Sequence, residues 1–403
     1  MAENILDLPL QHGQTASAPD LAGSGGVLTV DLDAVQANYR RVEGLAGGAK
    51  IGCLVKADAY GLGLAPVARV LAQAGCGTFF VAEAPEGGRL RKILPRLPIY
   101  VLNGLFAHTA ALYRAHDLRP CLSSLDEVKD WAEEARKSGQ ALPAALHFDT
   151  GLNRLGIPAS EADELFANPQ LLHGITIDLV MSHLACADEP EHPKNAQQLA
   201  RFREIRARFP HAKASLSNSA GIFLGTDYYF DLVRPGIGIF GGNPFSSREN
   251  PFQNVARIEA RVLQLREISK GETVGYGATY VAQGPRRLAV LSAGYGDGYF
   301  RALGSANASG GRVWLKGHYA PVAGRVSMDM TSIDITDIPA GLVARGDLAE
   351  LLGSHVSVDE LGLKAGTIGY EMLTSLGARY ARLYTLNGRI TDDSALAPDG
   401  EKS

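Results

Sequence analysis

A lysine with a sequence context suited to covalent chemistry stands at position 56. Residues 51–55 are mostly apolar and predict a buried strand, and Gly61 and Gly63 then open a loop. Lys56 therefore lies where a strand ends, and apolar neighbours there can lower its pKa enough for a Schiff base to form with a carbonyl. Taken alone, an ordinary exposed lysine is the simpler interpretation. The rest of the chain must provide a carbonyl group and a site that holds it.

Other polar side chains follow later predicted strands. His147 and Asp149 end one strand, with Arg154 shortly after them, and His183 ends the next. A hydrogen-bonded core histidine is the simpler interpretation of His183 alone.

Two turns further along the chain predict an anion site. Asn218 and Ser219 end a strand and precede a predicted helix, whose free N–H groups would face an anion, although the same residues could equally be a simple N-cap. Residues 234–238 (RPGIG) end the following strand, where glycines allow a ligand close to the backbone. A reactive lysine and a phosphate site on one rim imply pyridoxal phosphate.

Composition favours small-molecule chemistry. The chain of 403 residues has 46% hydrophobic and 20% charged residues and a net charge of -4, without a dense basic run. These values are not typical of a protein that binds nucleic acid or an anionic membrane. The four cysteines form no CxxC pair, so we expect neither a metal site nor a disulfide framework, and we expect a cytoplasmic protein without a signal peptide or membrane span.

These residues must be positioned by an α/β fold, because strands and helices alternate along the first two thirds of the chain. Eight strands are predicted at 51–55, 78–82, 99–102, 119–122, 144–148, 177–182, 213–217 and 232–239, with helices including 65–74, 86–94, 125–137 and 195–208. This pattern predicts a (β/α)8 barrel of the TIM type, whose active site forms where the strands end. A doubly wound sheet is the alternative, but the G-x-G-x-x-G at Gly236, Gly238 and Gly241 is not followed by the helix that a dinucleotide site needs.

The remaining chain predicts a second domain. Strand-like runs at 258–268, 287–293, 312–316 and 320–335 are joined by turns, and the only long helix expected is at 366–376. We expect a disordered tail over 1–26, the barrel over 27–255, a mainly β domain over 256–395 and a tail over 396–403. The strand at 27–31, which precedes the barrel, is a candidate to pair with the second domain.

At this point the chain resembles alanine racemases, the fold-type III pyridoxal-phosphate enzymes. The resemblance begins with residues 55–61 (VKADAYG), which look like the cofactor-lysine motif of that family, and extends over about residues 27–386. Further matches, in order, are 149–156 (DTGLNRLG), 181–188 (MSHLACAD), 217–220 (SNSA), 233–241 (VRPGIGIFG), 274–280 (VGYGATY), 294–298 (GYGDG), 324–329 (GRVSMD) and 369–372 (GYEM). Nine motifs in one order do not arise by chance.

The resemblance implies a two-base mechanism. Lys56 would form the Schiff base with the cofactor and act as one base, and Tyr276 from a partner subunit would act as the second, because one lysine cannot reach both faces of a planar carbanion. His183 and Arg234 would favour the phenolate form of Tyr276. Arg234 would also face the pyridine nitrogen and leave it unprotonated, since a guanidinium keeps its proton. That arrangement would suppress transamination and disfavours a decarboxylase.

The resemblance also implies a set of binding residues and a homodimer with shared sites. His183 would pack on the cofactor ring, and Tyr295 and Tyr370 would narrow the entrance. The substrate carboxylate would be held by Arg154 and by the backbone of the partner's Met328. The phosphate contacts would come from Tyr60, Ser219, Gly236, Ile237 and Tyr370, with Asn218 beside them.

Two positions depart from the family pattern. His147 stands where many members have a lysine carrying a carbamate that neutralises the arginine, so we expect chloride, water or another acidic side chain beside Arg154. Ser327 replaces a cysteine found in several relatives, with little expected effect.

The function implied is interconversion of L-alanine and D-alanine, either to supply D-alanine for peptidoglycan or in alanine catabolism. A racemase of broader amino-acid scope stays open, because one sequence does not locate the residues that set pocket size. A single-barrel pyridoxal-phosphate carrier would lack both the β domain and the partner tyrosine.

Overall fold

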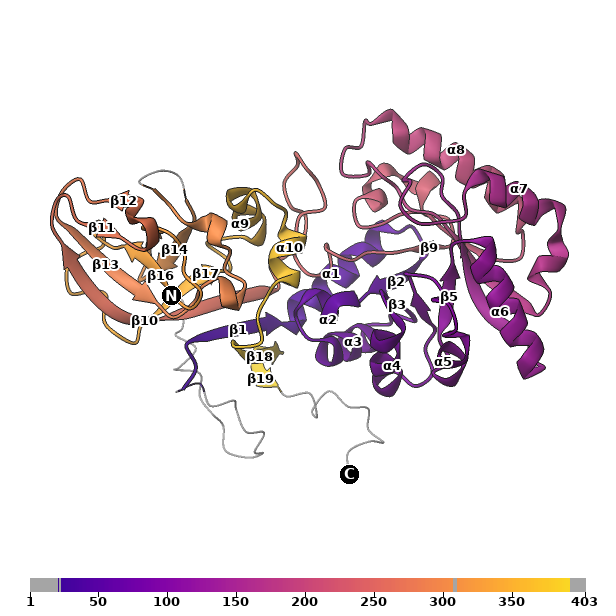
Figure 1. Ribbon diagram of the computed structural model, residues 1–403, viewed down its shortest axis with the longest axis horizontal. Coiled ribbons are helices and arrows are strands. Elements are labelled where there is room, and N and C mark those ends of the chain that lie inside the picture. The colour runs from indigo at the N-terminus through magenta and orange to yellow at the C-terminus, as the bar shows by residue number, and fades with distance from the viewer. Residues whose placement is uncertain (1–20, 22, 307–309, 392–403) are drawn as a thin grey trace, which may run out of the picture.

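The computed structural model describes residues 21, 23–306 and 310–391, and these form two lobes (Figure 1). One lobe contains the alternating strands and helices of the first part of the chain, and the other contains most of the later strands. Nearly all of the tail expected over 1–26, and the whole tail expected over 396–403, lie outside the described residues.

Eight parallel strands form the first lobe, as the alternating pattern predicted. They neighbour one another in the order β8-β7-β6-β5-β4-β3-β2-β9, and every pairing is parallel. The ring closes between its ends, because Asp231 N donates to Ala214 O and Arg234 N donates to Ser217 O. The strands are β2 (Lys50–Leu54), β3 (Thr78–Val81), β4 (Ile99–Val101), β5 (Arg119–Leu122), β6 (Leu142–His147), β7 (Ile175–Met181), β8 (Lys213–Ser215) and β9 (Leu232–Val233).

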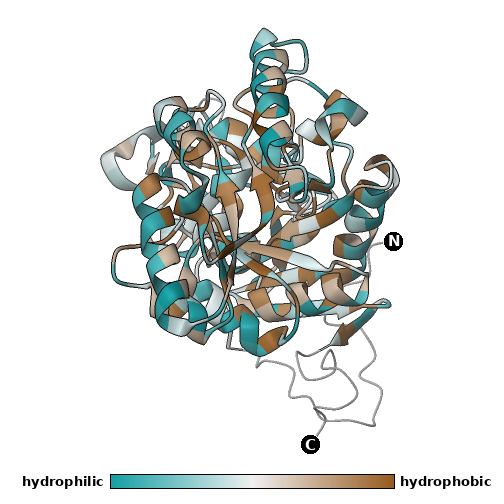
Figure 2. Ribbon diagram, turned by 90° about the vertical axis from the view of Figure 1, so that its right-hand side faces the viewer, coloured by the Kyte–Doolittle hydropathy of each residue, from teal (hydrophilic) through white to brown (hydrophobic). Residues whose placement is uncertain are grey.

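Helices surround this barrel, and an end-on view shows apolar strands in the middle with more polar helix surfaces outside (Figure 2). The helices are α1 (Leu32–Leu45), α2 (Lys56–Tyr60), α3 (Leu64–Gln73), α4 (Ala84–Ile93), α5 (Ala110–Ala115), α6 (Leu125–Ser138), α7 (Ala159–Ala167) and α8 (Pro193–Arg208). Local capping explains several boundaries. Asp31 caps α1 by accepting from Ala34 N, and Ser124 caps α6 by accepting from Glu127 N.

The last barrel strand is shorter than its apolar run predicted. The prediction was 232–239, but β9 ends at Val233, and the chain then turns through residues 234–242. Pro235 has no N–H to donate to a ladder, and the N–H groups of Gly236 and Gly238 donate to Ser219 Oγ instead. The glycine-rich run is therefore a turn and not a strand.

The second lobe is built on β10 (Ala256–Ile268), which pairs antiparallel with β1 (Gly26–Asp31), β13 and β17. Strand β1 also pairs in parallel with β18, so the strand ahead of the barrel belongs to this sheet. The other elements are β11 (Thr273–Val274), β12 (Tyr280–Val281), β13 (Arg286–Leu291), β14 (Arg312–Leu315), β15 (His318–Pro321), β16 (Thr331–Asp334), β17 (Leu348–Leu352), α9 (Val358–Ala365), α10 (Gly369–Thr374), β18 (Ala381–Leu386) and β19 (Arg389–Thr391).

Two sequence predictions for this lobe were wrong in detail. The strand predicted at 320–335 is divided into β15 and β16, because Gly324 has φ of 80° and packs so closely that a Cβ there would lie 2.6 Å from Val274 O. The helix predicted at 366–376 is the shorter α10, preceded by α9.

The end of the chain joins the two lobes at the lysine loop. Helix α10 packs so tightly on this loop that a Cβ at Gly61 would lie 2.2 Å from Leu373 O. Arg382 Nη1, on β18, donates to Gly61 O at 2.7 Å. The loop that carries Lys56 is therefore held by both lobes of one chain.

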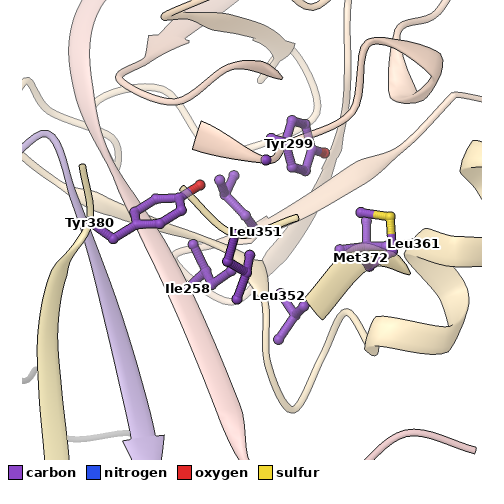
Figure 3. Close-up of a pocket in the computed structure, with 9 residues that line it drawn as sticks. Ile258, Tyr299, Leu351, Leu352, Leu361, Met372 and Tyr380 are labelled. Carbon is purple, nitrogen blue, oxygen red and sulfur yellow. The ribbon is translucent and has the colours of Figure 1, made fainter. Parts of the chain in front are cut away.

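A small cavity lies in the second lobe among Ile258, Leu351, Leu361, Met372 and Tyr299 (Figure 3). Its lining is apolar apart from two tyrosine hydroxyls and includes no charged side chain, so it does not suit a charged ligand. The Tyr299 hydroxyl is buried and has no hydrogen-bond partner among the described residues.

Replacing Tyr299 by phenylalanine is expected to stabilise the protein by about 1 kcal/mol, because it removes a buried polar group that has lost its water. Thermal unfolding of the purified protein measures the change. Tyr280→Phe is the matched control, since the Tyr280 hydroxyl donates to Asp334 Oδ2 at 3.0 Å and its loss should lower stability. A destabilised Tyr299→Phe protein would show that this hydroxyl has a partner.

Candidate active site

Lys56 lies two residues after the end of β2 and begins a backbone turn of unusual hand. Residues 57–60 all have φ between 53° and 55°, the left-handed region that side chains other than glycine rarely adopt. Surrounding contacts hold this turn: Glu86 Oε1 accepts from Ala57 N at 2.7 Å, and Asp58 Oδ1 accepts from Leu64 N at 2.8 Å. Strained backbone of this kind is common at functional sites.

The electrostatic surroundings of Lys56 match the sequence hypothesis. Burial lowers the pKa of its ammonium group, the charge of Arg154 lowers it further, and Glu86 opposes the shift. A lower pKa increases the fraction of neutral amine, which is the form that attacks a carbonyl.

A second group of residues forms a cradle next to this turn. Ser219 Oγ accepts from Gly236 N at 2.9 Å and from Gly238 N at 3.3 Å. A Cβ at Gly236 would lie 2.2 Å from the Tyr60 hydroxyl, so only glycine allows this approach. The Tyr60 ring stacks on the Phe240 ring. The centres of the Tyr60 and Tyr370 rings lie 6.3 Å apart. Ile237 is buried in the same turn.

The helix expected after Ser219 was a wrong prediction. Only a short 3-10 turn (Gly221–Leu224) begins there, and the Asn218 side chain caps it by accepting from Gly221 N at 2.9 Å. No α-helix N-terminus is therefore present here, and the polar groups at this point are the hydroxyls of Tyr60 and Ser219 and the backbone of the glycine turn.

Arg234 is a buried cation whose described hydrogen-bond partners are all neutral. Its Nη1 donates to Ser215 Oγ at 2.5 Å, and its Nη2 donates to Ser182 O at 2.6 Å and to Leu216 O at 3.5 Å. Burial lowers the pKa of the guanidinium to about 10, so it stays charged at neutral pH. Buried charges in proteins are usually paired, so a buried guanidinium without a carboxylate favours a ligand that offers it a further acceptor or a negative charge.

Two histidines beside Arg234 are neutral at physiological pH. Desolvation lowers the pKa of His183 well below its ordinary value, and Arg234 and Arg154 add to this effect. Burial, then Arg234 and Arg154, lower the pKa of His147 to about 4. The site therefore has the charges of Lys56, Arg154 and Arg234 and suits a ligand with more than one negative charge.

Arg154 itself is exposed, and no carboxylate in the described part of the chain forms an ion pair with it. His147 cannot substitute for a carbamate, because its ring is neutral. The Nδ1 atom of His147 lies 3.4 Å from Ser123 Oγ.

Three predicted site residues are not brought to Lys56 within one chain. Tyr276, Tyr295 and Met328 are exposed on the second lobe by 73%, 43% and 54%. Figure 1 places β11 and β12, which flank Tyr276, at the end of the molecule away from the barrel. Tyr295 and Met328 are neighbours, because Tyr295 N donates to Ser327 O and Gly296 N donates to Met328 O. This placement is the one expected of residues that serve another subunit.

Sequence reasoning missed several supporting residues. Glu86 binds the N–H groups of both Ala57 and Ala82, and Arg382 binds the lysine loop from the second lobe. Arg325 packs against the Tyr276 turn, with Nη1 2.8 Å from the position of a Cβ at Gly277. Arg325 could have been found from the sequence, because it belongs to the motif 324–329. Glu86 and Arg382 could not, because they stand in ordinary helix and strand patterns.

Across residues 21, 23–306 and 310–391, no cluster of His, Cys, Asp and Glu could hold a metal ion. No helix in these same ranges is both long and apolar enough to cross a membrane.

A desolvated lysine at a barrel rim, near a buried arginine that has no carboxylate partner among the described residues, suits the class of pyridoxal-phosphate enzymes. Comparison with known proteins identifies the family. Residues 30–244 match the model for the alanine racemase N-terminal domain, and residues 255–384 match the model for the C-terminal domain. The chain belongs to the alanine racemase family.

Individual relatives agree with the family models. An alanine racemase from Methylobacterium nodulans is 48% identical, over 89% of this chain and 96% of that protein. A catabolic alanine racemase from Mesorhizobium japonicum is 46% identical, over 90% of this chain and 94% of its own length. The crystal structure of alanine racemase from Bartonella henselae, with covalently bound pyridoxal phosphate, has a TM-score of 0.85 and 38% identity, over 90% of this chain and 100% of that chain. The enzyme is thus an isomerase that uses pyridoxal phosphate and interconverts L-alanine and D-alanine.

Proposed function

We propose that Lys56 and the partner subunit's Tyr276 carry protons to and from opposite faces of the alanine Cα. The observation that carries this assignment is the position of Lys56, on a strained turn beside the phosphate cradle, with Tyr276 exposed far from it in the same chain. Two bases are needed because a planar carbanion presents two faces.

Bound pyridoxal phosphate supplies an electron-withdrawing ring that acidifies the Cα proton of the attached amino acid. Its phosphate would be held by the hydroxyls of Tyr60, Ser219 and Tyr370 and by the backbone of Gly236 and Ile237. Asn218 supports these contacts by capping the adjacent turn.

Arg234 and His183 act on the ring. Arg234 would face the pyridine nitrogen of the bound cofactor and, because a guanidinium keeps its own proton, would leave that nitrogen unprotonated. Such a ring would withdraw electrons less strongly than a protonated one, which would disfavour protonation at the wrong carbon. Neutral His183 would pack on the ring face.

The substrate carboxylate is held by Arg154 and by the partner's Met328 backbone, and Tyr295 with Tyr370 narrows the entrance. This arrangement requires a homodimer, with each site completed by the other chain. We also propose a domain boundary at 255/256 and a cytoplasmic location, which the four free cysteines support.

Incubation of the purified protein with each enantiomer of alanine in deuterated water tests this function. Deuterium at Cα of the inverted enantiomer, without release of carbon dioxide, is the expected result. Release of carbon dioxide, or recovery of unexchanged alanine, would contradict it. Other amino acids tested in the same assay measure the breadth of substrate scope.

An anion is expected beside Arg154, in the place of the family carbamate. No carboxylate of the described residues pairs with Arg154, and water cannot neutralise its charge. Crystals soaked in bromide should therefore show an anomalous peak within hydrogen-bond distance of the guanidinium, and Arg154→Gln crystals should lack it. A wild-type structure with Arg154 unpaired would refute the expectation.

A further inference from the structure

A buried hydrogen-bond network lies between the barrel and α8, next to the proposed cofactor ring. At its centre, Thr150 is only 1% exposed, and its Oγ1 lies 2.7 Å from Ser182 Oγ. Gln198, on α8, is fully buried, and its Nε2 donates to Thr150 Oγ1 at 3.2 Å. The same amide donates to His183 O at 2.9 Å and accepts from Ala185 N at 2.8 Å.

The network reaches both residues that are proposed to act on the ring. Ser182 O accepts from Arg234 Nη2, and His183 is held through its own carbonyl. Every bond that the Gln198 side chain makes goes to the loops after β6 and β7, and none goes to α8 itself. Gln198 therefore joins two loops to each other and does not stabilise its own helix.

The direction of the Arg234 side chain depends on these contacts. No carboxylate orients the guanidinium, and its described acceptors are the two carbonyls of Ser182 and Leu216 and the hydroxyl of Ser215. Hydrogen bonds weaken steeply away from their preferred geometry, so a shift of Ser182 would also displace Arg234.

We propose that Thr150 and Gln198 are positioning residues for the racemisation, which set the placement of Arg234 and His183 against the cofactor ring. Neither side chain touches the substrate. This inference rests on the proposed roles of Arg234 and His183.

The matched pair Thr150→Val and Thr150→Ser tests the proposal. Valine has nearly the shape of threonine but no hydroxyl, whereas serine keeps the hydroxyl. We expect Thr150→Val to lose on the order of tenfold in kcat in both directions, with KM for alanine little changed, because a small misplacement of catalytic groups is costly. Thr150→Ser should restore most of the loss. Rates are divided by the amount of bound cofactor, so that poor folding does not count as lost catalysis.

Visible circular dichroism of the bound cofactor is the second readout, since it reports how the ring is held and requires no turnover. We expect a changed signal for Thr150→Val and also for Gln198→Met, and a signal like that of the wild type for Thr150→Ser. The proposal is overturned if Thr150→Val matches the wild type in kcat and dichroism, or if the valine and serine variants lose activity equally. A wild-type protein that fails to racemise alanine would instead overturn the proposed function, and the dichroism would still test the positioning role.

Discussion

Replacing Lys56 by alanine is expected to reduce racemisation in both directions by at least about 10³-fold, since positioned proton-transfer groups contribute 10² to 10⁴ and the covalent link to the cofactor is lost as well. Burial and the charge of Arg154 lower the pKa of the Lys56 ammonium group, and Glu86 opposes the shift, so Lys56 has the environment that this role requires. Rates in both directions, measured with saturating cofactor, give the loss.

Lys50→Ala is the control, because Lys50 is an exposed lysine at the start of β2, the strand that precedes Lys56. A second measurement, on the wild-type protein, distinguishes loss of the catalytic lysine from misfolding of the variant. Borohydride treatment of the wild-type protein should fix the cofactor on the peptide that contains Lys56, and mass spectrometry should find no such adduct in Lys56→Ala. Full activity in Lys56→Ala, or an adduct at another lysine, would disprove the assignment.

The pattern of elements was predictable because it depends on local periodicity. Apolar runs alternating with helical spacing indicated all eight barrel strands, and the polar residues at their ends included Lys56, His183, Ser219 and Arg234. The family motifs then assigned their roles. Loops were less predictable: β9 ended at Val233, and no α-helix follows Ser219, because side-chain hydrogen bonds from another loop replace regular backbone pairing there.

Contacts between distant segments of the chain could not be predicted from the sequence. The left-handed turn at 57–60 contains no glycine, so nothing in its composition predicts positive φ. It is held by Glu86, 29 residues after Ala57, and by Arg382 from the second lobe. The link from Gln198 to Thr150 likewise spans 48 residues and has no periodic signal.

Replacing Tyr276 by phenylalanine should slow proton transfer on one face of Cα far more than on the other. The phenol is the proposed base for one enantiomer, while Lys56 still serves the other. In deuterated water, exchange at Cα without inversion should therefore persist for one enantiomer, while racemisation falls by about 10²-fold or more. Equal exchange of both enantiomers at wild-type rates would show that Tyr276 is not a base.

Mixing the two inactive variants tests whether the site is shared. If Tyr276 serves the partner, a hybrid of one Lys56→Ala chain and one Tyr276→Phe chain has one site with both native residues and one site with neither. Random reassociation in equal amounts makes about half of the dimers hybrid, so about a quarter of wild-type activity should return. If Tyr276 served its own chain, each site of the hybrid would lack one base and no activity would return. The exposed position of Tyr276, on the lobe away from its own barrel, favours the first result.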